Sequence, residues 1–289
     1  MASSNSSAAA SLRAATAQLS AVSETARLDA EILMAHALGL SRADMLMRQH
    51  DLAVPDSFTG FIERRAAAEP VAYIRGVQEF WDLTLTVTPD VLIPRGDSET
   101  LIEAAIEAFD GRAGPMRILD LGTGSGALLL AALSVFPEAR GVGIDASSTA
   151  LAVATDNANR LGFGESAEFK HLNWCDVGWS GGLGQFDLIL CNPPYVEDGA
   201  ALDATVVLYE PLTALFAGPV GLNDYRILIP QIPALLASGG VAIFEIGHTQ
   251  ADDVGKLASK AGLSTEMRRD LAGKPRCLRF SLGIDQAHG

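Results

Sequence analysis

The stretch ILDLGTGSG (residues 118–126) joins an apolar run to a turn that contains three spaced glycines. An apolar segment of helical length, ALLLAALSVF, follows directly. Glycine allows a sharp turn and lets the backbone approach a ligand closely. The stretch is therefore typical of a buried strand, a ligand-binding loop and the start of a helix.

Apolar runs continue to alternate with helical segments from residue 117 onward. The runs are RILDL, GVGID, AEFKHL, FDLIL and VAIFEI. They are nearly continuous rather than alternating, as expected when helices cover both faces of a parallel sheet. A final run, RCLRFSL, is expected to add a last strand that could be antiparallel. The pattern predicts the α/β fold class.

The first part of the chain has a different period. Segments such as ARLDAEILMAHALG, which ends at Gly39, and SFTGFIERRAAAE, which stops before Pro70, are typical of a small helical bundle. LTLTVT (residues 83–88) then alternates strictly, and together with the following VLIP it suggests a β-hairpin. We therefore expect a helical docking domain over 1–78, with its first 10–20 residues disordered, a hairpin linker over 79–96 and a catalytic domain over 97–289.

The composition excludes several classes of protein. The 289 residues carry a formal net charge of −14, which disfavours stable nucleic-acid binding because phosphate backbones would be repelled. No apolar stretch approaches the length of a membrane span. The three cysteines are unclustered and form no metal-ligand spacing with the five histidines, so no metal is expected and a reducing, cytoplasmic location is favoured.

The residues around the glycine loop indicate which cofactor it binds. Asp145 ends GVGID about 20 residues after Gly122, where an acid can bind the two ribose hydroxyls. A second interpretation of Asp145, compatible with ribose binding, is that it forms the N-cap of the next helix. The G-x-G-x-G spacing follows an acid, Asp120, which would repel a phosphate but could attract an ammonium group. DLGTGSG therefore resembles the S-adenosylmethionine loop of Rossmann-like methyltransferases, and the resemblance places Trp174 beside the adenine unless it is a core or lid residue.

The run FDLIL ends in a stiff polar corner, Asn192-Pro193-Pro194-Tyr195. Ligands of such sheets bind outside the carboxyl ends of the strands, so Asn192 and Gly122 are expected to open into one crevice. The corner resembles the motif of methyltransferases that modify planar amino groups, namely adenine N6, cytosine N4 or the glutamine side-chain amide. In isolation, the same residues would also suit an ordinary turn with a rim tyrosine.

The corner has an intelligible chemistry. A conjugated nitrogen is a poor nucleophile because its lone pair is delocalised. The Asn192 side-chain oxygen and the Pro193 carbonyl can accept its two N–H groups, which aims the nitrogen at the sulfonium methyl and favours loss of planarity. Pro194 helps to stiffen the corner, and the ring of Tyr195 can stack on the planar group. No strong base is visible, and none is required before methyl transfer.

Segments along almost the whole chain match one family. They include ARLDAEILMAHALG, PVAYIRGVQEFW, LIPRGDSE, DLGTGSG, NPPY, GLNDYRILIPQ, FEIG and DLAGKPR. The chain is similar to the HemK/PrmC family of glutamine-N5 methyltransferases, which modify the Gly-Gly-Gln (GGQ) motif of peptide chain release factors in translation termination. The resemblance implies a Rossmann-like, seven-stranded methyltransferase domain preceded by a small N-terminal helical bundle and a β-hairpin linker.

The family's roles carry over to matching positions. The resemblance implies S-adenosyl-L-methionine as cofactor, held by Gly122, Thr123, Gly124, Ser125, Gly126, Asp145, Trp174 and Asn192. It implies that the glutamine contacts Asn192, Pro193, Pro194 and Tyr195, of which Asn192, Pro193 and Tyr195 are the catalytic group. The GGQ-containing domain of a release factor would be the partner of a monomeric enzyme.

The sequence differs from the family pattern at two places, and three alternative functions remain open. Gly96 replaces a proline that is usual at the junction, which predicts a looser turn, and Pro230 with Pro233 should delay or kink a helix. Rival functions are glutamine methylation of a ribosomal protein, adenine-N6 methylation of nucleic acid, and cofactor binding without catalysis. The net charge disfavours the nucleic-acid substrate, and the intact corner disfavours the non-enzymatic alternative.

Overall fold

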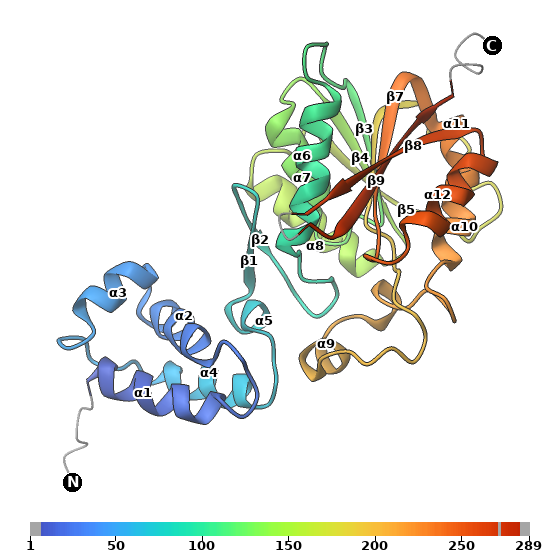
Figure 1. Ribbon diagram of the computed structural model, residues 1–289. Helices are drawn as coiled ribbons and strands as arrows, with labels where there is room; N and C mark the ends of the chain where they lie inside the picture. The colour runs from blue at the N-terminus through green and yellow to red at the C-terminus, as the bar shows by residue number, and fades with distance from the viewer. Residues whose placement is uncertain (1–6, 271–272, 284–289) are drawn as a thin grey trace. The chain divides into compact units, whose positions relative to one another are not determined.

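The computed structural model describes residues 7–270 and 273–283 (Figure 1). It divides the chain into two compact units, and each is described by itself. The first contains Met1–Val77 with Leu202–Glu210, and the second contains Gln78–Ala201 with Pro211–Gly289. No pattern in the sequence had predicted that Leu202–Glu210, which follows the NPPY corner, belongs to the first unit.

The first unit is helical. Its helices are α1 (Ala8–Leu19), α2 (Ala26–Leu38), α3 (Arg42–Arg48), α4 (Ser57–Ala66), α5 (Val71–Arg75) and α9 (Ala204–Tyr209). Gly39 ends α2 in the left-handed conformation, at φ 65°, as expected of a helix stop. The Tyr209 hydroxyl donates to the Ala67 carbonyl at 2.9 Å, which attaches α9 to the bundle.

The expectation of a disordered start is wrong for Ala8–Leu19, which form α1. Leu12, Ala15 and Leu19 lie on one side of this helix and are buried in the core of the bundle. Their apolar spacing supplies the burial that orders the helix, so Ser and Ala content alone was a poor guide. Residues 1–6 of the same expected segment lie outside the described residues.

A two-stranded hairpin, β1 (Val77–Phe80) with β2 (Leu83–Thr86), begins the second unit. The hairpin was predicted, but its arms differ from those expected, because VLIP (residues 91–94) forms no strand. Val91 and Ile93 are buried without joining a sheet. Proline provides no backbone N–H, so Pro89 before this run and Pro94 at its end oppose a hydrogen-bonded ladder.

The main sheet has seven strands in the order β5-β4-β3-β6-β7-β9-β8. Their bounds are β3 (Arg117–Leu121), β4 (Arg140–Asp145), β5 (Ala167–His171), β6 (Phe186–Cys191), β7 (Leu236–Glu245), β8 (Leu263–Arg269) and β9 (Pro275–Leu282). Strands β3 to β7 pair in parallel, and β9 is antiparallel to both β7 and β8. This confirms the predicted strands and the antiparallel RCLRFSL. Strand β8 was missed because it is an edge strand with mostly exposed residues, so it carries no apolar run.

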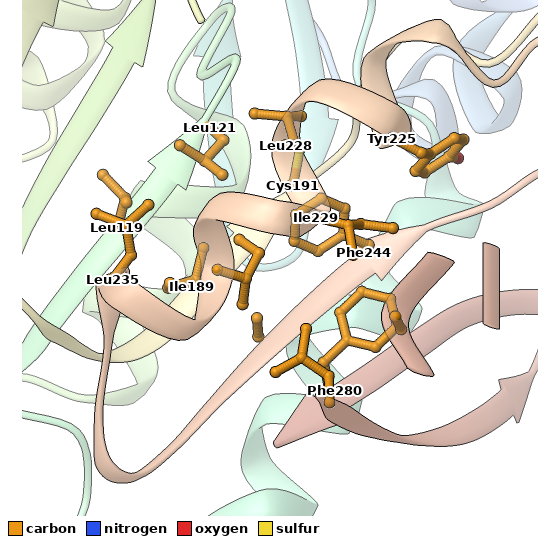
Figure 2. Packing of buried hydrophobic residues seen from close by; sticks show 14 of the residues in the cluster. Leu119, Leu121, Ile189, Cys191, Tyr225, Leu228, Ile229, Leu235, Phe244 and Phe280 are labelled. Atoms are coloured by element: carbon orange, nitrogen blue, oxygen red, sulfur yellow. The ribbon is translucent and has the colours of Figure 1, made fainter. Parts of the chain in front are cut away.

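Helices cover both faces of this sheet (Figure 1). One face carries α6 (Glu99–Ala108), α7 (Ala127–Val135) and α8 (Ser148–Arg160), and the other carries α10 (Asn223–Leu228), α11 (Ile232–Leu235) and α12 (Ala251–Lys260). Successive residues of β6 alternate between the two cores: Leu188 packs with the first group and Ile189 with the second. Figure 2 shows the second core, where Ile189 lies near Leu119 and Leu235.

The family departures have local consequences. A 3-10 turn (Ile229–Gln231) separates α10 from α11, and a proline stands in the first turn of both the 3-10 segment and α11, so the expected interruption at Pro230 and Pro233 is confirmed. Gly96 begins another 3-10 turn (Gly96–Ser98) that runs directly into α6. A side chain added at Gly96 would meet nothing within 4 Å, so crowding does not require glycine at this position.

No helix in the described ranges is both long and apolar enough to cross a membrane.

Candidate active site

The carboxyl ends of four neighbouring strands meet at one edge of the sheet. The register pairs the last residues of β3 with those of β4 and β6, and the end of β6 with the end of β7. The residues at or just after these ends are Gly122, Asp145, Asn192 and Glu245. The glycine loop and the NPPY corner therefore open at the same edge, as expected of a doubly wound sheet.

A cavity of about 360 Å³ lies at this edge, entirely within the second unit. Most of the predicted site lines it: Gly122, Thr123, Gly124, Ser125, Asp145, Trp174, Asn192 and Pro194. Gly126, Pro193 and Tyr195 do not line it, although Gly126 is the N-cap of α7 and Pro193 is buried in the corner. The wall also includes Phe80, Val91 and Ser98, and no motif had predicted Val91 or Ser98 there.

The glycine loop turns tightly at the end of β3. Gly122 and Gly124 have φ values of 76° and 54°, which favour glycine. A Cβ added at Gly122 would lie 3.1 Å from the ring of Trp174. The indole therefore packs closely against a backbone that has no side chain at this point.

Asp145 accepts two backbone hydrogen bonds at the cavity wall. Its Oδ2 accepts from the Gly124 N–H at 2.9 Å, and its Oδ1 accepts from the Ser147 N–H at 2.8 Å. Ser147 is the N-cap of α8, and its hydroxyl oxygen accepts from the Ala150 N–H at 3.1 Å. The N-cap interpretation of Asp145 is thus wrong. The carboxylate, half-buried and held by the glycine loop, keeps lone pairs that can accept hydroxyl groups.

Asp120 is a buried carboxyl group in the same wall, with 1% of its surface exposed. Its Oδ2 accepts from the Thr123 hydroxyl at 2.7 Å, whereas its Oδ1 has no hydrogen-bond partner in the described part of the chain. Burial raises the pKa of Asp120 to about 7; the Thr123 hydrogen bond opposes this shift and the Asp145 charge adds to it. A buried carboxyl oxygen without a partner suits a cationic donor in the cavity.

Trp174 is both packed against the core and exposed to the cavity. The indole N–H donates to Asp224 Oδ1 at 2.8 Å, and the ring packs against the core beneath the sheet edge. The half-buried side chain also lines the cavity. Its orientation is therefore set by packing, while it presents part of its surface to a ligand.

The NPPY corner is held by side chains from three other segments. Asn192 Nδ2 lies 3.3 Å from the Ser98 hydroxyl oxygen, and the Tyr195 hydroxyl donates to Glu245 Oε1 at 3.1 Å. The Gln250 Nε2 group donates to the Tyr195 carbonyl at 3.0 Å. These bonds fix the corner before any substrate is present, which reduces later reorganisation.

Comparison with known proteins agrees with this geometry. Residues 10–76 match the family model of the PrmC N-terminal domain, and residues 114–261 match that of a methyltransferase domain. A release factor glutamine methyltransferase from Rhodospirillum rubrum is 43% identical over 88% of this chain and 78% of its own length. One from Cereibacter sphaeroides is 39% identical over 95% of this chain and 98% of its own.

The chain belongs to the release factor glutamine methyltransferase family.

Solved structures show the same catalytic fold. A T. thermophilus 16S rRNA methyltransferase, solved with AdoMet and guanosine, is 20% identical and has a TM-score of 0.50. The match covers 72% of this chain and 50% of the T. thermophilus chain. A methyltransferase from Pyrococcus furiosus is 19% identical and has a TM-score of 0.51. The match covers 69% of this chain and 89% of the Pyrococcus chain. At this identity the likeness shows the fold alone.

Within this family member, sequence reasoning missed Ser98 and Glu245 as parts of the site. Both lie in segments that matched the family, LIPRGDSE and FEIG, but neither received a role. One signal was available for Glu245. It is a charged residue at the end of an almost wholly apolar strand, and such positions in parallel sheets border the ligand crevice. Of the DLAGKPR match, residues 271–272 lie outside the described residues.

Proposed function

We propose that the protein transfers the methyl group of S-adenosyl-L-methionine to the side-chain amide nitrogen, N5, of the glutamine in the GGQ motif of peptide chain release factors. One observation carries the chemistry: the glycine loop, Asp145 and Asn192 line one cavity. Membership of the release factor glutamine methyltransferase family supports the choice of substrate. The NPPY corner by itself supports only a planar amino group.

The cavity suits this cofactor. We assign the ribose hydroxyls to Asp145, the adenine to the face of Trp174, and close backbone contact to Gly122 and Gly124. The unpartnered Oδ1 of Asp120 suits the ammonium group of the methionine moiety. When bound, the cofactor supplies an electrophilic methyl on a positively charged sulfur.

The chain's own residues then act on the acceptor nitrogen. The Asn192 Oδ1 and the Pro193 carbonyl accept the two N–H groups of the glutamine amide, which holds its nitrogen toward the methyl donor. Because these acceptors favour a nitrogen that has lost planarity, they bind the transition state better than the flat amide. After transfer the nitrogen loses a proton, so the corner needs no strong base.

The substrate assignment is tested by labelling. The purified protein is incubated with labelled S-adenosylmethionine and, separately, with a release factor, the same factor with its GGQ glutamine changed to alanine, a ribosomal protein fraction, and rRNA or DNA. We expect label only in the unmodified release factor. Equal labelling of both release-factor forms, or labelling of ribosomal protein or nucleic acid alone, would contradict the proposal.

We further propose that the enzyme acts as a cytoplasmic monomer without stable nucleic-acid binding. The net charge of −14 supports the last point, since an acidic surface repels phosphate. Light scattering should return the mass of one 30.3 kDa chain. A dimer mass, or retention on RNA at moderate salt, would contradict this part.

The pKa of Asp120 predicts how pH acts on the cofactor-free protein. Its value of about 7 in the folded state exceeds the ordinary 3.8, so the folded protein binds more protons between these values. The contribution of this group to the free energy of unfolding should therefore fall as pH rises from about 4 to about 7 and stay constant above that. An ammonium ligand favours the ionised carboxylate, so cofactor binding should strengthen over the upper part of this window and release protons.

Isothermal titration in buffers of different ionisation enthalpy measures that proton release. We expect Asp120→Asn to weaken binding and to abolish most of the pH dependence. Asp156→Asn, on the exposed face of α8, is the matched control and should retain both. Proton release that is the same in Asp120→Asn as in the wild type would show that Asp120 does not meet the ligand.

A further inference from the structure

A chain of buried hydrogen bonds lies behind the cavity wall. Glu245, at the end of β7, has 2% of its surface exposed and does not line the cavity. Its Oε2 accepts from the Ser98 hydroxyl at 2.5 Å, and the same Ser98 oxygen lies 3.3 Å from Asn192 Nδ2. Ser98 belongs to the cavity wall but is only 3% exposed, so little water reaches these contacts.

The direction of these bonds follows from the number of protons available. A serine hydroxyl has one proton, and Ser98 gives it to the Glu245 carboxylate. Toward Asn192 the Ser98 oxygen can only accept, so the side-chain amide must present its NH₂ end to Ser98. The Oδ1 end of Asn192 is thereby directed away from Ser98 and is left for the acceptor amide.

We propose that Glu245 is a positioning residue that acts through Ser98 to set which end of the Asn192 amide faces the substrate. This inference rests on the proposed function, because only an acceptor that donates N–H groups needs the oxygen end. With the amide reversed, Asn192 would present N–H groups to the N–H groups of the glutamine, and the corner could not bind it productively.

The surrounding groups are consistent with an ionised Glu245. Burial raises its pKa, and the Asp97 charge adds to this, whereas the hydrogen bonds from Ser98 and Tyr195 and the Arg276 charge lower it. Both oxygens of the carboxyl group are hydrogen-bonded to hydroxyl groups, Oε2 to Ser98 and Oε1 to Tyr195. The two donors thus hold the carboxylate as an acceptor on both oxygens.

The second oxygen of Glu245 fixes the other end of the corner. Its Oε1 accepts from the Tyr195 hydroxyl, so one carboxylate holds Tyr195 directly and Asn192 through Ser98. Removing the carboxylate should loosen both, whereas removing Ser98 Oγ should release only Asn192. The two substitutions therefore separate the effect on the amide from the effect on the tyrosine.

The test compares Glu245→Met, Glu245→Gln, Ser98→Ala and the Glu245→Met/Ser98→Ala pair. We expect kcat for release-factor methylation to fall about tenfold or more in Glu245→Met and in Ser98→Ala, the scale of one lost buried hydrogen bond. Glu245→Gln should lose less, because its single oxygen can still accept from Ser98. The double variant should be little worse than Glu245→Met, since both act on the same amide. The Kd for S-adenosylmethionine should change less than about twofold in Glu245→Met and Glu245→Gln, because Glu245 does not line the cavity.

Tyr225→Phe is the matched control. The Tyr225 hydroxyl donates to the main-chain carbonyl of Glu245 at 2.7 Å and is fully buried, but it does not touch the carboxylate. We expect Tyr225→Phe to lower the unfolding temperature while kcat stays within about twofold of the wild type. A purely structural role for Glu245 would instead make Glu245→Met and Tyr225→Phe behave alike.

A readout independent of turnover keeps the two proposals distinguishable. In protein containing isotope-labelled asparagine, the side-chain amide signal of Asn192 is identified by its loss in Asn192→Ala. It should shift in Glu245→Met and Ser98→Ala and stay in place in Tyr225→Phe. An unmoved signal in Glu245→Met, or losses of kcat that multiply in the double variant, would overturn the role of Glu245. A wild-type protein that fails to label release factor would instead contradict the proposed function, whatever the signal does.

Discussion

Asn192→Ala should remove most turnover and leave S-adenosylmethionine binding within a few-fold of the wild type. In the proposed mechanism the side-chain oxygen is the acceptor that aims the reacting nitrogen, and loss of one such preorganised group costs about 10²–10³ in kcat. The contacts proposed for the glycine loop, Asp145 and Trp174 should remain, because these residues end or follow strands other than β6. Steady-state labelling of a release factor and cofactor titration measure the two quantities.

Asn159→Ala is the control for this prediction. Asn159 lies on the exposed side of α8 and loses the same side-chain atoms. Its rate and cofactor affinity should match the wild type. Wild-type turnover in Asn192→Ala would show that the amide clamp does not operate. A parallel loss of cofactor binding would assign Asn192 mainly to the cofactor.

Gly221→Ala should disrupt the NPPY corner by displacing the main chain of Tyr195. Gly221 has a φ of 63°, and a Cβ added there would collide with the Tyr195 carbonyl oxygen and lie 2.7 Å from Gln250 Nε2. A backbone oxygen cannot turn away as a side chain can, so Tyr195 must move and lose its bond from Gln250. We expect a loss of about 2–5 kcal/mol in the free energy of unfolding and a fall in kcat of at least about tenfold.

Gly111→Ala separates backbone strain from collision. Gly111 has a similar φ of 70°, but an added Cβ would meet nothing within 4 Å. The free energy of unfolding of Gly111→Ala should fall by only about 1–2 kcal/mol, and its kcat should match the wild type. Denaturant unfolding and labelling measure both variants. If Gly221→Ala loses no more stability than Gly111→Ala and keeps its rate, the close approach to Tyr195 does not hold the corner.

Most of the fold was predictable because its signals are local. Strands β3, β4, β6 and β7 are buried on both faces, and strands buried in this way consist of nearly continuous apolar residues. Strand β8 escaped because an edge strand is partly exposed. VLIP (residues 91–94) was wrongly assigned to the hairpin because burial of Val91 and Ile93 mimics a strand pattern. Composition cannot tell packing against a cavity wall from pairing in a sheet.

The sequence by itself determined the cofactor loop and the reacting corner, since each is a short motif at the end of a strand, and parallel strands end at the same edge. Only the tertiary structure decided how that corner is held. Ser98 and Glu245 lie 147 residues apart in the chain and meet beside Asn192 because β7 pairs with β6 and α6 packs across the sheet. The direction of a hydrogen bond depends on which groups are adjacent in space, and no local pattern of residues records that.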